Sequence, residues 1–145
     1  MKNLLFMLLL LLLGGCYKLD DSNPTPIKEA IFGQSKPATA ADYAGNFETT
    51  DGCNQQGNLG KYSVSISVES NTQLLVRNLA NFMRSVNVTV TLNDKNLLIA
   101  RQTTAGGLVF EGSGTANSRN SLTINYTIRD SNGRSVSCQA TLQRQ

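Results

Sequence analysis

Apolar and polar residues alternate with a period of two through most of the chain after residue 42. Such alternation is typical of strands that bury one face and leave the other in water. Four runs show it cleanly, at 61–69, 86–92, 121–129 and 136–142. Four weaker runs lie at 45–50, 72–78, 96–103 and 107–116. The pattern therefore predicts an all-β fold of about eight antiparallel strands.

Short polar segments with turn chemistry join several of these runs, at 93–96, 117–120 and 130–133. They predict that most neighbouring strands form hairpins. Eight meandering strands leave two sheet edges that must be closed or covered. The two solutions are an up-and-down barrel, in which the first and last strands pair, and a two-sheet β-sandwich. An immunoglobulin-type sandwich would place a buried Trp beside its disulfide, and the chain has no Trp.

Residues 1–15 read as a lipoprotein signal peptide. Lys2 supplies the positive start, and ten consecutive apolar residues follow, too few to span a bilayer as a helix. Leu13-Gly14-Gly15-Cys16 then resembles the bacterial lipobox. The resemblance implies that Cys16 becomes the mature N-terminus and carries acyl chains, palmitate among them, that anchor the protein in a membrane. The alternative is an ordinary secretory signal followed by a coincidental cysteine.

Residues 16–41 are expected to form the lipidated N-terminus and a flexible tether. All three prolines of the chain, Pro24, Pro26 and Pro37, lie in this segment. The charged segment 18–21, Lys-Leu-Asp-Asp, resembles the surface-export signal of Bacteroidota lipoproteins. It implies an outer-membrane protein displayed on the cell surface, and the alternative is an outer-membrane protein that faces the periplasm.

The remaining cysteines, Cys53 and Cys138, are expected to pair, because an exported protein folds in an oxidising compartment. The bond would link the loop after the first strand to the last strand. In a closed barrel these strands are neighbours, so the disulfide would staple the seam. The alternative is that Cys138 is a free buried thiol, in phase with Val136 and Ala140.

One family resemblance spans the predicted β domain, residues 42–145. Gly45-Asn46-Phe47 looks like the Gly-x-Trp opening of lipocalins, with Phe47 where the Trp would be. Arg144 follows the last strand, where lipocalin-like barrels often place an arginine over that aromatic residue. Together with the cysteine pair and the Gly-Ser-Gly-Thr segment at 112–115, the pattern is similar to small lipocalin-like lipoproteins of Bacteroidota. The resemblance implies a lipocalin-like barrel.

The sequence offers little catalytic chemistry. The absence of His removes Ser-His-Asp triads and imidazole metal ligands, and the net charge of +3 does not indicate nucleic-acid binding. No phosphate-binding loop or EF-hand spacing is present, so no cofactor and no metal are expected. Asp51 and Glu48 read as solvated surface charges. A hydrolase would need two facing carboxylates, for which Glu48, Glu69 and Glu111 are the strand candidates.

The sequence therefore predicts a non-enzymatic envelope lipoprotein whose barrel binds a small apolar ligand or an envelope protein. The alternative is a structural or accessory lipoprotein without a small-molecule ligand, and a carboxylate-based hydrolase is disfavoured. The candidate contact residues are Phe82, Tyr62 and Tyr126. Both tyrosines share the phase of the apolar residues on their strands, which favours the core, whereas Phe82 sits in a turn-like segment. The abundance of Asn, Ser, Thr and Gly suits an extracellular surface and carbohydrate contact.

Overall fold

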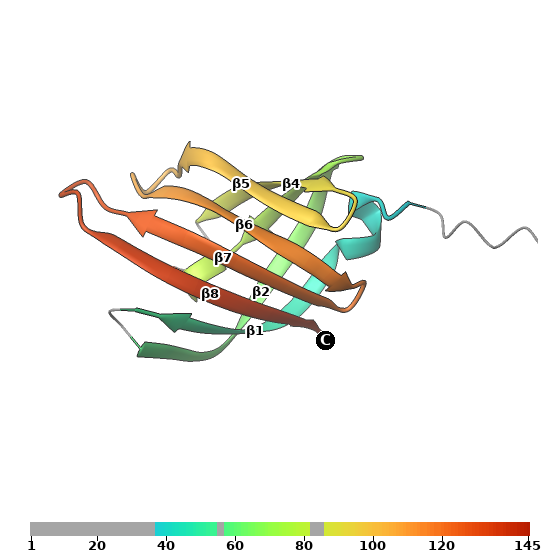
Figure 1. The fold of residues 1–145 in the computed structure, drawn as a ribbon, viewed down its shortest axis with the longest axis horizontal. Helices are drawn as coiled ribbons and strands as arrows, with labels where there is room; N and C mark the ends of the chain where they lie inside the picture. The colour runs from blue at the N-terminus through green and yellow to red at the C-terminus, as the bar shows by residue number, and fades with distance from the viewer. Residues whose placement is uncertain (1–36, 55–56, 82–85) are drawn as a thin grey trace, which may run out of the picture. The chain divides into compact units, whose positions relative to one another are not determined.

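Eight antiparallel strands close into a barrel in chain order, and β8 pairs with β1 (Figure 1). The computed structural model describes residues 37–54, 57–81 and 86–145, so the signal peptide, most of the linker, Cys16 and Phe82 lie outside the described residues. The elements are η1 (Ala40–Tyr43), β1 (Gly45–Cys53), β2 (Gly57–Ser70), β3 (Gln73–Arg77), η2 (Leu79–Asn81), β4 (Asn87–Asn93), β5 (Asn96–Thr103), β6 (Val109–Ser118), β7 (Ser121–Arg129) and β8 (Ser135–Arg144). All eight expected strands are present, and the up-and-down barrel is confirmed over the sandwich.

The inner face of the barrel is filled by its own side chains. The period of two places a mainly apolar set of side chains on the inner face, as the sequence predicts, and β1 adds the polar Thr49 and Asp51 to it. A void large enough for water would leave the surrounding side chains partly accessible. The large inner side chains that are less than 2 % exposed are Phe47, Phe110, Leu74, Leu79, Ile99, Leu122, Ile124, Leu142, Val64, Val76, Val88 and Val90. The barrel is therefore a packed core along this stretch.

One end of the barrel is closed by Arg144 and the turn η1. The Arg144 guanidinium lies 5.0 Å from the centre of the Phe47 ring, a cation–π contact. Its Nη1–H donates to the Ala44 carbonyl at 2.6 Å, and its Nη2–H donates to the Asp42 carbonyl at 2.9 Å. Gly45 has a φ of 145°, which L side chains rarely adopt, and a Cβ there would lie 2.6 Å from Arg144 Nη1, so a larger residue would be strained and would displace the guanidinium. The expected arginine over the aromatic residue is confirmed.

The seam between β1 and β8 runs from the pair Phe47–Arg144 to the pair Cys53–Cys138. The two cysteines form a disulfide with their Cα atoms 4.1 Å apart, as expected from a closed barrel. The expectation that Cys53 lies in a loop is wrong, because Asp51, Gly52 and Cys53 continue the ladder with β8. Cys53 is thus the last residue of β1, and the disulfide is a direct cross-strand bond.

The opposite end of the barrel is covered by η2, in which Leu79 and Ala80 are buried. Asn78, Ala80 and Asn81 have left-handed backbone conformations, with φ of 66°, 65° and 56°. Asn tolerates this region, but a left-handed Ala is strained and persists only where contacts hold it.

In the three described ranges, no helix is both long and apolar enough to cross a membrane.

Candidate functional site

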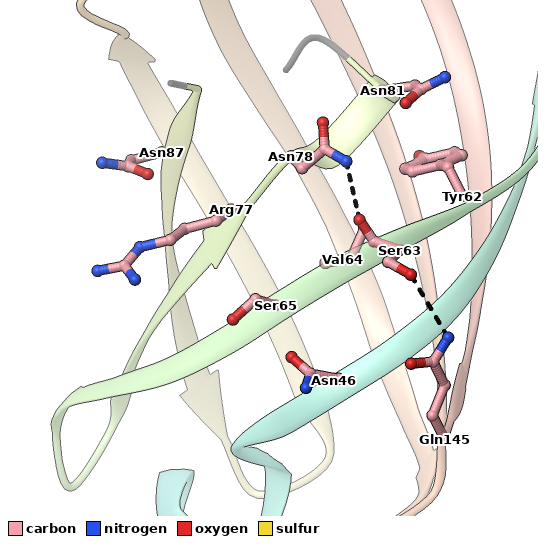
Figure 2. A pocket seen from close by; sticks show the side chains of 10 residues that line it. All are labelled: Asn46, Tyr62, Ser63, Val64, Ser65, Arg77, Asn78, Asn81, Asn87 and Gln145. Atoms are coloured by element: carbon pink, nitrogen blue, oxygen red, sulfur yellow. Dashed lines mark hydrogen bonds between the residues drawn. The ribbon is translucent and has the colours of Figure 1, made fainter. Parts of the chain in front are cut away.

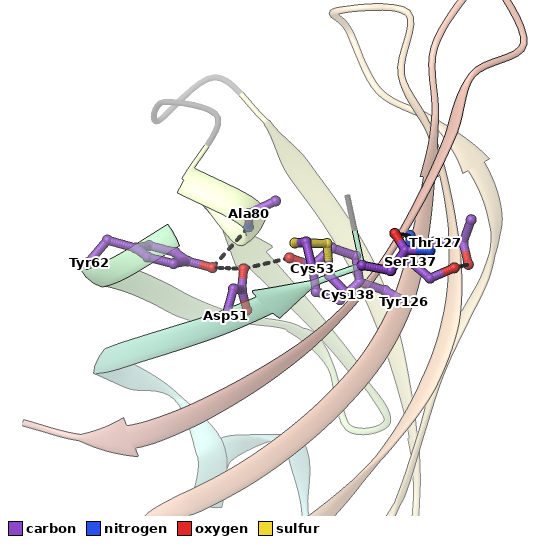
Figure 3. Close-up of a disulfide and its surroundings, with 9 residues drawn as sticks. Asp51, Cys53, Tyr62, Ala80, Tyr126, Thr127, Ser137 and Cys138 are labelled. Carbon is purple, nitrogen blue, oxygen red and sulfur yellow. Dashed lines mark hydrogen bonds between the residues drawn. A yellow bond between two sulfur atoms is a disulfide. The ribbon is translucent and has the colours of Figure 1, made fainter. Parts of the chain in front are cut away.

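A buried carboxylate with two tyrosine partners lies inside the barrel beneath η2 (Figure 3). Asp51 is 1 % exposed, and its Oδ2 accepts hydrogen bonds from the hydroxyls of Tyr62 and Tyr126, the latter at 2.6 Å. The prediction that Asp51 is a solvated surface charge is therefore wrong. The reason is its register, because Asp51 shares the inward phase of β1 with Phe47 and Cys53.

The cluster of Asp51, Tyr62 and Tyr126 connects three parts of the barrel. The Tyr62 hydroxyl also accepts a hydrogen bond from the Ala80 backbone N–H at 3.1 Å, which ties η2 to β2 and β1. The Tyr126 ring stacks on Phe110, with ring centres 6.1 Å apart. Tyr126 is buried, as its phase predicts, and Tyr62 is half-buried. The third expected contact residue, Phe82, lies outside the described residues. The structure therefore brings together two of the three, Tyr62 and Tyr126, on Asp51.

Burial controls the protonation of both phenols. Loss of solvent, followed by the hydrogen bond to the Asp51 carboxylate, raises the pKa of Tyr62 and Tyr126 above the ordinary value of 10.0. Both hydroxyls therefore stay protonated at neutral pH and serve as hydrogen-bond donors to Asp51. The three side chains therefore form a fixed, hydrogen-bonded polar cluster inside an otherwise apolar barrel.

Asn78 Oδ1 next to η2 is buried without a hydrogen-bond partner in the described part of the chain, as are two oxygens inside the barrel, Asp51 Oδ1 and Thr49 Oγ1. Both residues point inward from β1, two positions apart. Buried polar atoms are nearly always paired in proteins, so each such atom is a place to look for a bound polar group. Asp51 Oδ1 and Thr49 Oγ1 are therefore inward-facing oxygens with unused hydrogen-bonding capacity in the described part of the chain.

A second feature, the polar groove, lies on the outer face of β1 to β4 (Figure 2). It has a volume of about 800 Å³. Its described lining is dominated by amide and hydroxyl side chains, and no carboxylate is among them. The lining residues are Asn46, Tyr62, Ser63, Val64, Ser65, Arg77, Asn78, Asn81, Asn87 and Gln145.

Tyr62 belongs to both the groove and the buried cluster. Its hydroxyl is held by Asp51 and Ala80 inside the barrel, and its half-buried side chain lines the groove. Nearby, Asn78 Nδ2 donates to the Ser63 carbonyl at 2.8 Å, which fixes η2 against β2. The buried cluster therefore sets the position of one wall of the groove.

The carboxylates proposed for a hydrolase lie apart on the outer face. Phe110 is fully buried, so its neighbour Glu111 points outward and lines a shallower groove of about 470 Å³ over β1, β6, β7 and β8. Glu48 pairs with Lys61 at 2.7 Å, and Glu69 is exposed on β2. Neither Glu48 nor Glu69 lines this groove or the polar groove. Among the described residues, no three His, Cys, Asp or Glu side chains gather to hold a metal.

Replacing Tyr126 by Phe is expected to lower the free energy of unfolding by about 1.5–3 kcal/mol at pH 7. The substitution keeps the ring against Phe110 but removes one of the two hydrogen bonds to the buried Asp51 carboxylate. Chemical denaturation measures the loss. The matched control is Tyr43→Phe, whose ring is buried but whose hydroxyl has no hydrogen bond among the described residues, and an equal loss in both variants would refute the role of Asp51.

A comparison of the native protein with Tyr126→Phe at high pH gives a second test of the cluster. A phenol whose pKa is raised by folding stabilises the protein fully below pH 10, and this contribution is lost as the pH rises above 10. The native protein should therefore lose stability more steeply than Tyr126→Phe above pH 10, by about 1.4 kcal/mol per pH unit. Parallel curves would contradict the assignment.

Comparisons with known proteins bear on the fold of the chain. No family model matches the chain, and no curated protein matches it. Two solved structures are similar: one described as EF1p2_mFAP2b bound to DFHBI, with 16 % identity and a TM-score of 0.53, and one described as a redesigned beta barrel, b11L5F_LGL, with 19 % identity and a TM-score of 0.53. Each covers 73 % of this chain, which spans 96 % and 94 % of them respectively. The likeness confirms a small closed β-barrel.

Proposed function

We propose that this protein is a non-enzymatic envelope lipoprotein, anchored through acyl chains on Cys16, whose barrel binds a partner or ligand through the polar groove. The observation that carries the proposal is the contrast between the two faces of the sheet. The inner face is filled by large apolar side chains that are less than 2 % exposed, whereas the outer face holds an open groove of about 800 Å³. The volume falls within the range of small-molecule sites, roughly 300–1,000 Å³.

The anchor and the export motif support the same reading. The lipobox ending at Cys16 would fix the protein to a membrane, and the segment 18–21 supports display on the cell surface. The proline-containing segment 16–41 would link this anchor to the disulfide-bonded barrel. The groove, rather than a hollow barrel axis, is then the binding face.

Native mass spectrometry of the full chain, expressed in a diderm bacterium and extracted in mild detergent, tests this proposal. We expect a protein that starts at Cys16, carries acyl groups and the disulfide, and retains no apolar molecule. Cys16→Ser should lose the acylation and leave the membrane fraction, whereas Cys53→Ser should remain anchored. An unacylated native protein would contradict the anchor.

A second candidate function is a carrier with a small ligand inside the barrel beneath η2. Two observations favour it: the unpartnered Asp51 Oδ1 in the interior and the similar barrel described as bound to DFHBI. The same mass spectrum separates the two candidates. An added small-molecule mass that survives Ser65→Trp, which would block the outer groove, but is lost in Asp51→Leu would favour the carrier over the groove.

A further inference from the structure

We infer that the polar groove binds a carboxylate-bearing saccharide, with Arg77 receiving the carboxylate. The inference rests on the proposed function, because it names the ligand class of the same groove. It starts from a row of four outward residues on successive strands. Asn46 pairs with Ser65, Ser65 with Arg77, and Arg77 with Asn87 in the strand registers.

The row places hydrogen-bonding side chains at regular intervals across the groove. Directly opposite residues on neighbouring strands have Cβ atoms about 4.5–5.5 Å apart, so neighbours in the row can contact one ligand together. Each Asn amide both donates and accepts hydrogen bonds, as does a serine hydroxyl. A saccharide presents hydroxyls that also donate and accept along an uncharged chain. The row therefore matches a polyhydroxyl ligand better than an apolar one.

Arg77 adds a preference for a negatively charged ligand. It is exposed, and among the described residues that line the groove it is the one charged side chain. It makes no ion pair or hydrogen bond in the described part of the chain, whereas Arg119 pairs with Asp42 at 3.3 Å and Arg144 bonds to backbone carbonyls. A guanidinium binds a carboxylate through two parallel hydrogen bonds. A guanidinium without a partner among the described residues, in a groove whose described lining holds no carboxylate, selects an acidic ligand.

Tyr62 borders the groove from the inner face of β2, at the end next to η2. Its side chain lines the groove beside Asn78 and Asn81 (Figure 2), and its hydroxyl is held from inside by Asp51 and Ala80. An aromatic side chain has an apolar body and a polar tip, and here the tip is already occupied. The ring is therefore held on the opposite face of β2 from Ser65, and the Asp51 cluster fixes this end of the groove from inside.

Isothermal titration of the lipidated full-length protein in detergent tests the inference with defined probes. The probes are galacturonate, glucuronate and sialyl oligosaccharides, each paired with its methyl ester, which has the same hydroxyls without the charge. We expect at least one acid to bind about tenfold or more tightly than its ester, and more weakly as salt is raised. Arg77→Gln should abolish this preference. Arg101→Gln, at an exposed arginine on β5 outside the groove, should leave it unchanged.

The outcomes test two claims separately: the acidic-saccharide inference and the role of the polar groove as the binding face. If no acid in the panel binds, or if acids and esters bind equally, the acidic-saccharide inference is overturned. A peptide or envelope protein whose binding is then lost in Ser65→Trp would leave the groove as the binding face and the proposed function intact. If an acid binds but Ser65→Trp and Arg77→Gln do not weaken it, both the inference and the groove fail.

Discussion

Replacing Cys53 and Cys138 together by Ala is expected to lower the free energy of unfolding by about 4–5 kcal/mol in the loop-closure model. The bond spans 85 positions, so it removes a large amount of chain entropy from the unfolded state. It also joins the first and last strands, which are the pair brought together across the longest stretch of chain. Its loss should therefore open the seam first. Urea denaturation of the oxidised protein and the double variant measures the difference.

Reduction of the native protein provides the matched control for this prediction. Reductant should move the native midpoint toward that of the double Ala variant and leave the variant itself unchanged. Identical midpoints for the oxidised native protein and the variant would refute a stabilising disulfide. The slope m should be larger in the variant and in the reduced protein, because an unfolded chain without the cross-link is more expanded and exposes more surface.

The barrel was predictable from the sequence because its signal is local. Every strand carries its own period-two pattern, and the disulfide and the Phe47–Arg144 contact both follow once the first and last strands are taken to pair. The predicted ends of the strands were less accurate. Asp51 lies between Thr49 and Cys53 in the inward phase, but the predicted strand ends at Thr50, which left Asp51 and Cys53 in the predicted loop. Extending the phase from Phe47 to Cys53 would have predicted a buried Asp51.

The polar groove could not be predicted, because its residues lie far apart in the chain. Asn46, Ser65, Arg77 and Asn87 come together only through the registers of three strand pairs. Each is an ordinary polar residue on the solvent side of its strand, and no local motif marks it. The lack of carboxylates among the described lining residues is likewise a property of the assembled surface. Register, which depends on packing and turn geometry, creates this site.

Replacing Phe47 by Ala is expected to lower the free energy of unfolding by about 3–5 kcal/mol. Phe47 is 0 % exposed, and its removal leaves a cavity at the closed end while Arg144 loses the ring beneath it. Phe47→Leu should lose less, because most of the volume is retained. In a double-mutant cycle with Arg144→Ala, the two residues should couple by about 0.5–2 kcal/mol. A coupling of zero would reduce the contact to simple packing.

Phe47 and the disulfide also test whether the seam behaves as one unit. They stand six residues apart on β1, about 20 Å at the rise of a strand, and share no partner. Contacts that far apart normally contribute independently, so combining Phe47→Ala with the loss of the disulfide should give the sum of the two effects within about 0.5 kcal/mol. A combined loss well below the sum would mean that opening either end already opens the whole β1–β8 ladder. Equilibrium denaturation of the four proteins, with Phe47→Leu in place of Phe47→Ala if the combined variant fails to fold, distinguishes these outcomes.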